Sequence, residues 1–119
     1  MTMKVGTRQV DGVTIVDASG RITLGEGSVI LRDTVRDLLS KGNKKIVLNL
    51  AEVPYVDSAG LGEVVRTYTT VSRQGGSLKL LNLTKRITDL LSITKLLTVF
   101  ETFESEDEAV RSFSASARV

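Results

Sequence analysis

Residues 46–62 read IVLNLAEVPYVDSAGLG, an apolar run that leads through a turn into a segment with helical spacing. Four of the first five residues are apolar, and Asn49 is the single polar interruption. This pattern is typical of a strand buried on both faces, and it predicts a central, parallel strand. Pro54 cannot donate to a sheet ladder and favours extended geometry at Val53, so the strand is expected to end before Pro54.

A helix is expected directly after this turn. Asp57 or Ser58 can supply the N-cap oxygen, and the apolar residues that follow at helical spacing are Leu61, Val64, Val65, Tyr68 and Val71. The helix is expected to end near Gln74. Ser58 therefore lies at, or one residue inside, a helix N-terminus, where free N–H groups and the helix dipole stabilise negative charge. Gly60 and Gly62 each lower helix propensity by roughly 1 kcal/mol relative to Ala, which indicates close approach of another backbone or of a partner.

The segment before this stretch predicts a β-hairpin followed by a helix. Asp11-Gly12 suits a tight turn between two alternating segments, the second of which is expected to end at residues 19–20. Ser28 is the expected N-cap of a helix that ends at residues 41–43 and whose apolar face consists of Leu31, Val35, Leu38 and Leu39. Residues 20–27 contain three glycines but lack the Gly-Lys-(Ser/Thr) ending of a phosphate-binding loop, which argues against that motif.

The segment after this stretch alternates strands with helices. Residues 78–83 predict a strand parallel to the previous one, because a helix crosses between the two. Thr84 is the expected cap of a short helix, and residues 99–101 are expected to form a short strand. Ser105 and the acidic residues after it have the capping-box spacing, which predicts a final helix through Phe113. Residues 114–119 are expected to fray.

This order of elements predicts an α/β fold: a mixed sheet of four to five strands with an N-terminal β-hairpin, βαβ units and about four helices. A length of 119 residues, of which 41% are hydrophobic, supports one compact core, so we expect a single domain over residues 1–119. Right-handed crossovers would place the Ser58 turn where the parallel strands end, which is the edge where an open α/β sheet usually meets partners and ligands.

The composition excludes several classes of function. The chain has no Cys and no His, so a disulfide framework, a thiolate nucleophile, a Ser-His-Asp triad and a sulfur or imidazole metal site are all excluded. The net charge of +2 gives little support for nucleic-acid binding. No apolar run reaches the roughly 20 residues that span a bilayer, and the N-terminus lacks a signal-peptide core, so we expect a cytoplasmic protein without membrane insertion.

The strings VLNL at residues 47–50 and VDSAGLG at residues 56–62 resemble the sequence pattern of the STAS domain, in particular that of the bacterial anti-sigma factor antagonists (anti-anti-sigma factors). The similarity covers nearly the whole chain, and the STAS fold agrees with the order of elements above. In that family, the serine of the Asp-Ser-(Ala/Ser)-Gly-Leu-Gly segment is phosphorylated by an anti-sigma factor that is also a serine kinase. The matching position here is Ser58.

The resemblance implies a phosphorylation-gated partner switch that regulates transcription. The unmodified protein would bind an anti-sigma factor/serine kinase of the GHKL type and so free a sigma factor. Phosphorylation of Ser58 would end that binding, and a PP2C-like phosphatase would restore it. The chain would be a substrate and not an enzyme, with no cofactor and no metal. The residues implied in partner binding are Thr23, Asp57, Ser58, Ala59, Gly60, Leu61, Gly62, Glu63 and Arg66.

Individual roles follow from the position of each residue in this turn. Asp57 is expected to cap the helix or to orient the Ser58 hydroxyl. Glu63, Arg66 and Thr67 lie off the apolar stripe, so we expect them to be exposed. Family members commonly carry Gly-x-(Leu/Ile)-Asp in the loop after the second strand, with the aspartate near the phosphorylated serine.

In this chain that loop reads Gly20-Arg21-Ile22-Thr23, so a hydroxyl replaces the charge. Arg21 adds a cation that could stabilise a phosphate on Ser58. The adjoining residues 24–27 are either a partner contact or a mobile connection.

Two other readings of the sequence remain open. The chain could be a non-switching STAS module that binds a small ligand, such as a nucleotide or lipid, or that scaffolds a larger complex. It could also be an enzyme in its own right, although the lack of His, Cys, a clustered acidic metal motif and a phosphate-binding loop argues against this. On local chemistry alone, Ser58 could equally be a plain helix cap.

Overall fold

The structure is a computed structural model, and it describes residues 3–117. The described residues form a five-stranded sheet in the order β1-β2-β3-β4-β5. β1 pairs antiparallel with β2, and all other neighbours pair in parallel. The predicted α/β fold with an antiparallel hairpin and βαβ units is confirmed. The elements are β1 (Lys4–Val10), β2 (Val13–Ser19), α1 (Glu26–Ser40), β3 (Lys45–Glu52), α2 (Ser58–Arg73), β4 (Ser77–Leu81), α3 (Lys85–Ile93), β5 (Thr102–Phe103) and α4 (Glu106–Ala117).

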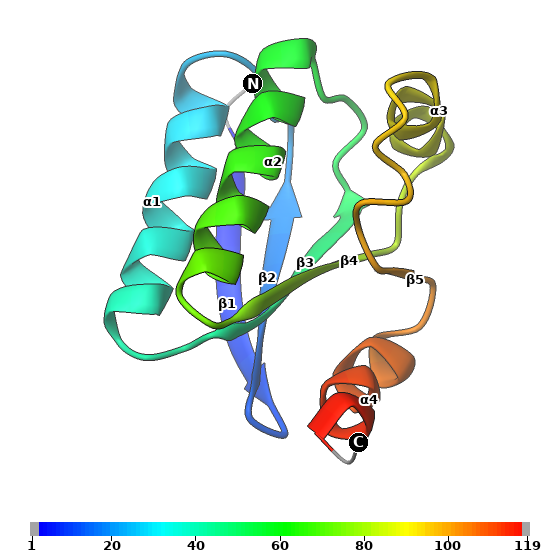
Figure 1. Ribbon diagram of the computed structural model, residues 1–119. Helices are drawn as coiled ribbons and strands as arrows, with labels where there is room; N and C mark the ends of the chain where they lie inside the picture. The colour runs from blue at the N-terminus through cyan, green and yellow to red at the C-terminus, as the bar shows by residue number, and fades with distance from the viewer. Residues whose placement is uncertain (1–2, 118–119) are drawn as a thin grey trace.

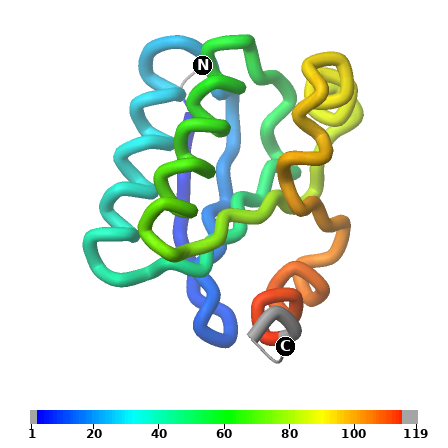
Figure 2. Tube along the Cα trace, viewed as in Figure 1, coloured from blue at the N-terminus to red at the C-terminus, as the bar shows by residue number. Residues whose placement is uncertain are grey.

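The helices form layers on the two faces of the sheet. Figure 1 shows α1 and α2 side by side on one face, α4 apart from them near the C-terminal end, and α3 beside the end of β4. The tube in Figure 2 shows that the start of α2, the loop before α1 and α3 lie at the same end of the molecule. Residues from α1, α2 and α3 share the larger core with the sheet, and α4 covers a smaller core on the other face.

Strand β3 contributes side chains to both cores, as its sequence predicts. Ile46, Leu48 and Leu50 belong to the larger core, whereas Val47 belongs to the core under α4. Because side chains alternate between the two faces of a strand, a continuous apolar run is what a strand between two helical layers requires. The strand ends at Glu52, before Pro54, as expected.

The N-cap of helix α1 differs from the predicted one. The helix begins at Glu26 rather than after Ser28, and its N-cap is Gly25, whose φ of 96° lets the chain reverse into the helix. Ser28 instead lies inside the first turn, where its hydroxyl donates to the carbonyl of Thr23 at 2.8 Å. The local pattern around Ser28 is that of a cap, but Gly25, three residues earlier, provides the turn.

Three other boundaries differ from the prediction. β4 ends at Leu81 because Asn82 takes a positive φ of 58°, which interrupts the strand before residue 83. β5 lies at Thr102–Phe103 and not at residues 99–101, because the Val99 N–H closes a turn onto the carbonyl of Leu96. α4 continues past Phe113 to Ala117, the fraying expected for residues 114–117 stays a prediction, and positions 118–119 lie outside the described residues.

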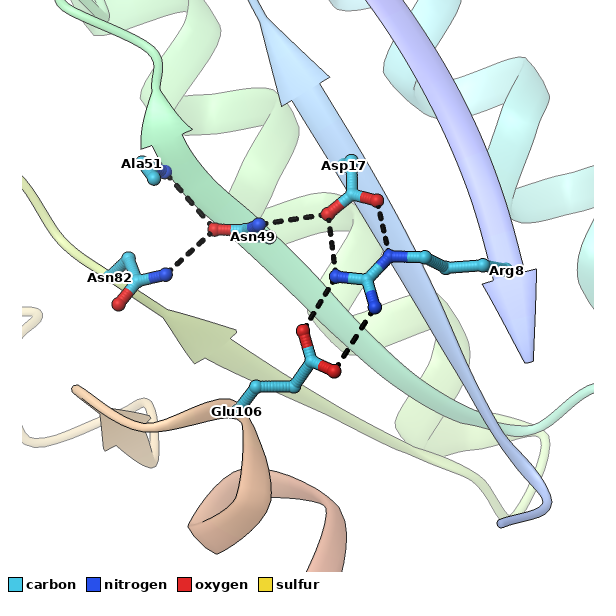
Figure 3. Close-up of polar contacts among 6 residues, drawn as sticks. All are labelled: Arg8, Asp17, Asn49, Ala51, Asn82 and Glu106. Atoms are coloured by element: carbon cyan, nitrogen blue, oxygen red, sulfur yellow. Dashed lines mark hydrogen bonds and ion pairs between the residues drawn. The ribbon is translucent and has the colours of Figure 1, made fainter. Parts of the chain in front are cut away.

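A chain of polar contacts ties α4 to the hairpin (Figure 3). Arg8 pairs with Asp17 at 2.6 Å and with Glu106 at 2.6 Å, and Asn49 donates to Asp17 at 2.8 Å. The amide of Asn82 donates to that of Asn49 at 3.1 Å. The hydrogen bonds from Arg8 lower the pKa values of Asp17 and Glu106 and raise the pKa of Arg8. The group therefore joins β1, β2 and α4 through charges that stay ionised near neutral pH, and the neutral Asn49 amide adds β3.

Within residues 3–117, no helix is both long and apolar enough to cross a membrane.

Candidate functional site

The Ser58 turn connects β3 to α2, and Ser58 is the first residue of the helix. The N-cap is Asp57, whose carboxylate accepts a hydrogen bond from the backbone N–H of Gly60 at 2.6 Å. Of the two candidate caps, the structure thus uses Asp57. The side chain of Ser58 is exposed, and its hydroxyl has no hydrogen bond to any other described residue. Ser58 is therefore an accessible hydroxyl at a helix N-terminus, where a negative charge is stabilised.

The loop after β2 packs directly against this turn. Ile22 forms an isolated parallel bridge with Val56, and the Asp57 N–H donates to the carbonyl of Ile22 at 3.3 Å. A Cβ built on Gly60 would lie 1.8 Å from that carbonyl oxygen. The predicted close approach of another backbone is confirmed at Gly60. At Gly62, the nearest atom to an added Cβ is in the flexible Arg66 side chain, at 3.5 Å, so no backbone approaches there.

Asp57 also holds the loop that contains Thr23 and Leu24. The second oxygen of its carboxylate accepts a hydrogen bond from the Leu24 N–H at 3.2 Å. The adjacent residue Thr23 is half-buried, and its carbonyl accepts bonds from Ser28. The Leu24 side chain is 79% exposed. A large apolar side chain is thus presented to solvent beside the Ser58 turn.

Helix α3 forms the opposite side of the turn. A cavity of about 320 Å³ is lined by Ser58 and Asp57 together with Arg86 and Ile93 of α3. The Ile93 side chain is 78% exposed. The guanidinium of Arg86 lies 5.6 Å from the ring centre of Tyr55. α3 therefore brings both a cation and an exposed apolar side chain to the cavity that contains Ser58.

Arg21 and Ser58 line different cavities. The Arg21 guanidinium is 5.7 Å from the ring centre of Tyr55, in a neighbouring cavity lined by Arg21, Pro54, Tyr55 and Arg86. Ser58 is not among the residues that line this cavity. Arg86 is the arginine that shares a cavity with Ser58, whereas Arg21 lines only the neighbouring one.

Several of the predicted contact residues are not on the surface. Glu63 is 2% exposed and Thr67 is 4% exposed, so the expectation that both are exposed is wrong. Leu61 is 7% exposed and belongs to the larger core, and Ala59 is half-buried. Arg66 is exposed, as expected. The buried positions follow from the α1·α2 contact, because α1 covers a wider stripe of α2 than the apolar residues alone indicate.

Sequence reasoning missed Tyr55, Arg86 and Ile93. Ile93 carried a signal, because it is an apolar residue outside the buried stripe of α3 formed by Ile87 and Leu91. No local pattern linked Arg86 to Ser58, since the two residues meet only through the packing of α3 beside the turn. Within the described part of the chain, no three acidic side chains converge in a way that could hold a metal ion.

Comparisons with known proteins identify the family of this fold. The model of the STAS domain matches residues 4–109. The anti-sigma-B factor antagonist of Bacillus subtilis (strain 168) is 36% identical over 101 residues, which cover 85% of this chain and 91% of that protein. The relative therefore aligns with this chain over most of its own length.

Solved structures agree on the architecture. An anti-sigma factor antagonist from Mycobacterium paratuberculosis has a TM-score of 0.81 at 19% identity, covering 93% of both chains. The Bacillus cell fate determinant SpoIIAA in its phosphorylated form has a TM-score of 0.72 at 17% identity, covering 92% of this chain and 99% of that one. Likeness at this level of identity shows the fold. The match of the STAS domain model over residues 4–109 also shows the family, so this chain belongs to the STAS domain family.

Proposed function

We propose that the protein is an anti-sigma factor antagonist that works as a phosphorylation-gated partner switch. The observation that carries the proposal is the exposed hydroxyl of Ser58, which lies at the start of α2 between two exposed apolar side chains. Leu24, 79% exposed, is held to the turn by Asp57, and Ile93, 78% exposed, lines the cavity that Ser58 shares with α3. Figure 1 shows the start of α2 between the loop that leads into α1 and helix α3.

Unmodified, this surface suits a protein partner. Leu24 and Ile93 can bury apolar area in an interface at little cost to the free protein, because neither belongs to a core cluster. Gly62, in the second turn of α2, has no side chain, and the nearest atoms to it belong to the flexible Arg66 side chain, so a partner backbone can approach there. The 36% identity to a protein named as an anti-sigma-B factor antagonist supports an anti-sigma factor as that partner.

A phosphate on Ser58 would change the same surface. It adds close to two negative charges and three acceptor oxygens at a helix N-terminus, which the fold tolerates. A partner that covers Leu24 and Ile93 would have to desolvate this dianion, at a cost of several kcal/mol. The modification should therefore act on the interface and leave the fold intact.

Arg86 is the residue that we propose to stabilise the phosphate. It lines the Ser58 cavity, and its guanidinium can donate two parallel hydrogen bonds to phosphate oxygens. Arg21, which the sequence alone nominated, contacts the same Tyr55 ring from a neighbouring cavity and is assigned a smaller part.

The catalytic groups would belong to the partners. A serine kinase of the GHKL type that is also the anti-sigma factor would transfer the phosphate, and a PP2C-like phosphatase would remove it. Because the proposed target regulates transcription, the switch would operate in the cytoplasm as a single domain, with no metal or cofactor of its own.

The test is phosphorylation followed by partner capture. The protein is incubated with ATP and the candidate anti-sigma kinase, the site is mapped by mass spectrometry, and binding is measured before and after. Ser58→Ala is compared with Ser72→Ala, a matched exposed serine at the far end of α2. We expect one phosphate on Ser58 in the wild type and in Ser72→Ala, with loss of partner binding. Binding that persists with Ser58 unmodified would contradict the switch and favour a non-switching STAS module.

A further inference from the structure

The packing of α1 against α2 buries a carboxylate among arginines, away from the Ser58 turn. Glu63 of α2 is 2% exposed, and one carboxylate oxygen lies 3.2 Å from Arg66 and 3.6 Å from Arg32 of α1. Glu63 is five residues beyond Ser58, which corresponds to about 7.5 Å along the helix axis. The cluster is therefore a feature of the helix pair and separate from the turn.

A cavity of about 240 Å³ lies between the two helices at this position, and Arg32, Arg36, Glu63, Arg66 and Thr67 line it. Liquid water occupies about 30 Å³ per molecule, so the space suits a small polar molecule. Arg36 has no acidic side chain within salt-bridge distance among the described residues. Arg32 and Arg66 share Glu63, and Arg32 also lies 3.9 Å from the exposed carboxylate of Asp33, so the three arginines exceed their acidic partners by one positive charge, that of Arg36.

Thr67 provides a second, independent observation. It is 4% exposed, and in the described part of the chain its hydroxyl oxygen is buried without any hydrogen-bond partner. A buried polar group without a partner is unfavourable, and such groups in native structures usually have a ligand, an ion or a water. The unused hydroxyl lies on a residue that lines the same cavity as the unpaired arginine.

We infer that this cavity binds the phosphate group of a small molecule. A phosphate would supply the negative charge that Arg36 lacks, and the planar guanidinium groups of Arg32, Arg36 and Arg66 match its oxygens. Thr67 would donate its hydroxyl to one of those oxygens. Glu63 is held by Arg32 and Arg66, and it keeps their side chains at the cavity while leaving further N–H groups for the ligand.

This inference does not depend on the phosphorylation of Ser58, and it assigns the arginines of α1 and α2 a role apart from partner binding. It can therefore be tested on the purified protein with inorganic phosphate as the probe, whether or not the proposed switch is correct. Binding is followed by the melting temperature and by NMR of the arginine side-chain N–H groups. Sodium chloride keeps the ionic strength constant.

We expect saturable binding of phosphate, with shifts at Arg32, Arg36 and Arg66 and not at Arg73. Arg36→Gln should weaken the affinity about tenfold, because it removes a charged hydrogen-bond donor. Arg73→Gln is the matched control, since Arg73 is, like Arg36, an exposed helical arginine, but it lies at the end of α2 and does not line the cavity. Equal affinities for these two variants would overturn the inference.

Two further variants should change the phosphate affinity in opposite directions. Thr67→Val keeps the shape of the side chain and removes the hydroxyl, so it should weaken phosphate binding. Glu63→Gln removes the only negative charge of the cavity, so it should strengthen binding. An unchanged affinity in both variants would overturn the site. Acetate at the same concentration separates the two kinds of oxyanion, and binding of acetate as tight as that of phosphate would overturn the assignment to phosphate.

Discussion

Asp57 and Leu24 are joined by a hydrogen bond of 3.2 Å from the Leu24 N–H to the Asp57 carboxylate, which also caps α2 through Gly60 at 2.6 Å. One carboxylate therefore fixes both the helix start and the loop that presents an exposed leucine. Its role goes beyond that of a plain cap, because the second bond spans 33 residues of sequence. Removing it should affect two segments at once.

Asp57→Ala should lower the free energy of unfolding by about 1–2 kcal/mol, the usual loss for a helix cap, and should also speed hydrogen exchange at the Leu24 amide. Thr84→Ala is the control, because Thr84 caps α3 through Ile87 alone. It should lower stability without changing exchange at Leu24. Urea unfolding and amide exchange measured by NMR check both effects, and an unchanged Leu24 amide in Asp57→Ala would contradict the two-segment role.

The two glycines of the turn should respond in opposite directions to the same substitution. In Gly60→Ala the new methyl group would meet the backbone carbonyl of Ile22, at 1.8 Å before relaxation, so the loss should reach the upper end of the range of about 1–3 kcal/mol for overpacking. In Gly62→Ala the methyl group has room, and helix propensity should raise stability by up to about 1 kcal/mol. Urea unfolding of the two variants is the measurement. Equal effects would show that the Ile22 loop is not held against α2.

Features that depend on residues close together in the sequence could be predicted. The hairpin at Asp11-Gly12, the parallel β3, the caps at Asp57, Thr84 and Ser105, and the tight approach at Gly60 each have a local signal in composition or spacing. These signals position Ser58 at the start of α2 without any knowledge of the tertiary structure.

The features that were predicted wrongly or missed depend on contacts between elements that are distant in the sequence. The pattern of α2 marks Glu63 as polar and therefore exposed, but Arg32 of α1 lies against it and allows the carboxylate to be buried. In the same way, the neighbourhood of Ser58 includes Arg86 and Ile93 only because α3 packs beside the turn. Periodicity within one helix cannot identify the residues that another helix brings to it.

If the proposed interface is correct, its apolar contacts should be removable without loss of stability. Leu24→Ser and Ile93→Ser should each weaken partner binding about tenfold, while the urea midpoint stays nearly constant because both side chains are almost fully exposed. Val99→Ser is the control, since Val99 is 41% exposed and does not line the Ser58 cavity. Titration calorimetry with the unmodified protein gives the affinities. Full affinity in both variants would place the interface elsewhere.

The ion-pair group at Arg8 should make stability depend on pH. Arg8 lowers the pKa values of Asp17 and Glu106, so the native state favours their ionised forms. That stabilisation is fully present above the ordinary carboxyl pKa values and is lost as the pH falls through the lowered ones. The three side chains are 39–42% exposed, so salt should weaken the effect as well.

Arg8→Met should therefore be less stable than the wild type near pH 7, and the difference should shrink below about pH 4, where the carboxylates begin to protonate. Urea midpoints measured across this range check the prediction. Lys85→Met serves as the control, because it removes an exposed pair with Asp89 that has no connection to another element. A difference that stays constant with pH would show that Arg8 contributes through packing instead of charge.

Arg86 should lower the second pKa of a phosphate on Ser58. Phosphoserine placed at position 58 by genetic encoding avoids the need for a kinase, and phosphorus NMR then gives the second pKa of the phosphate, which is about 6 for the free group. The helix N-terminus and Arg86 both favour the dianion, so this pKa should lie below that value. Arg86→Gln should raise it and Arg21→Gln should raise it less, because Arg86 lines the Ser58 cavity and Arg21 does not. An equal rise in the two variants would assign the phosphate to the cavity between both arginines, and no rise in either would leave the helix N-terminus as its only support.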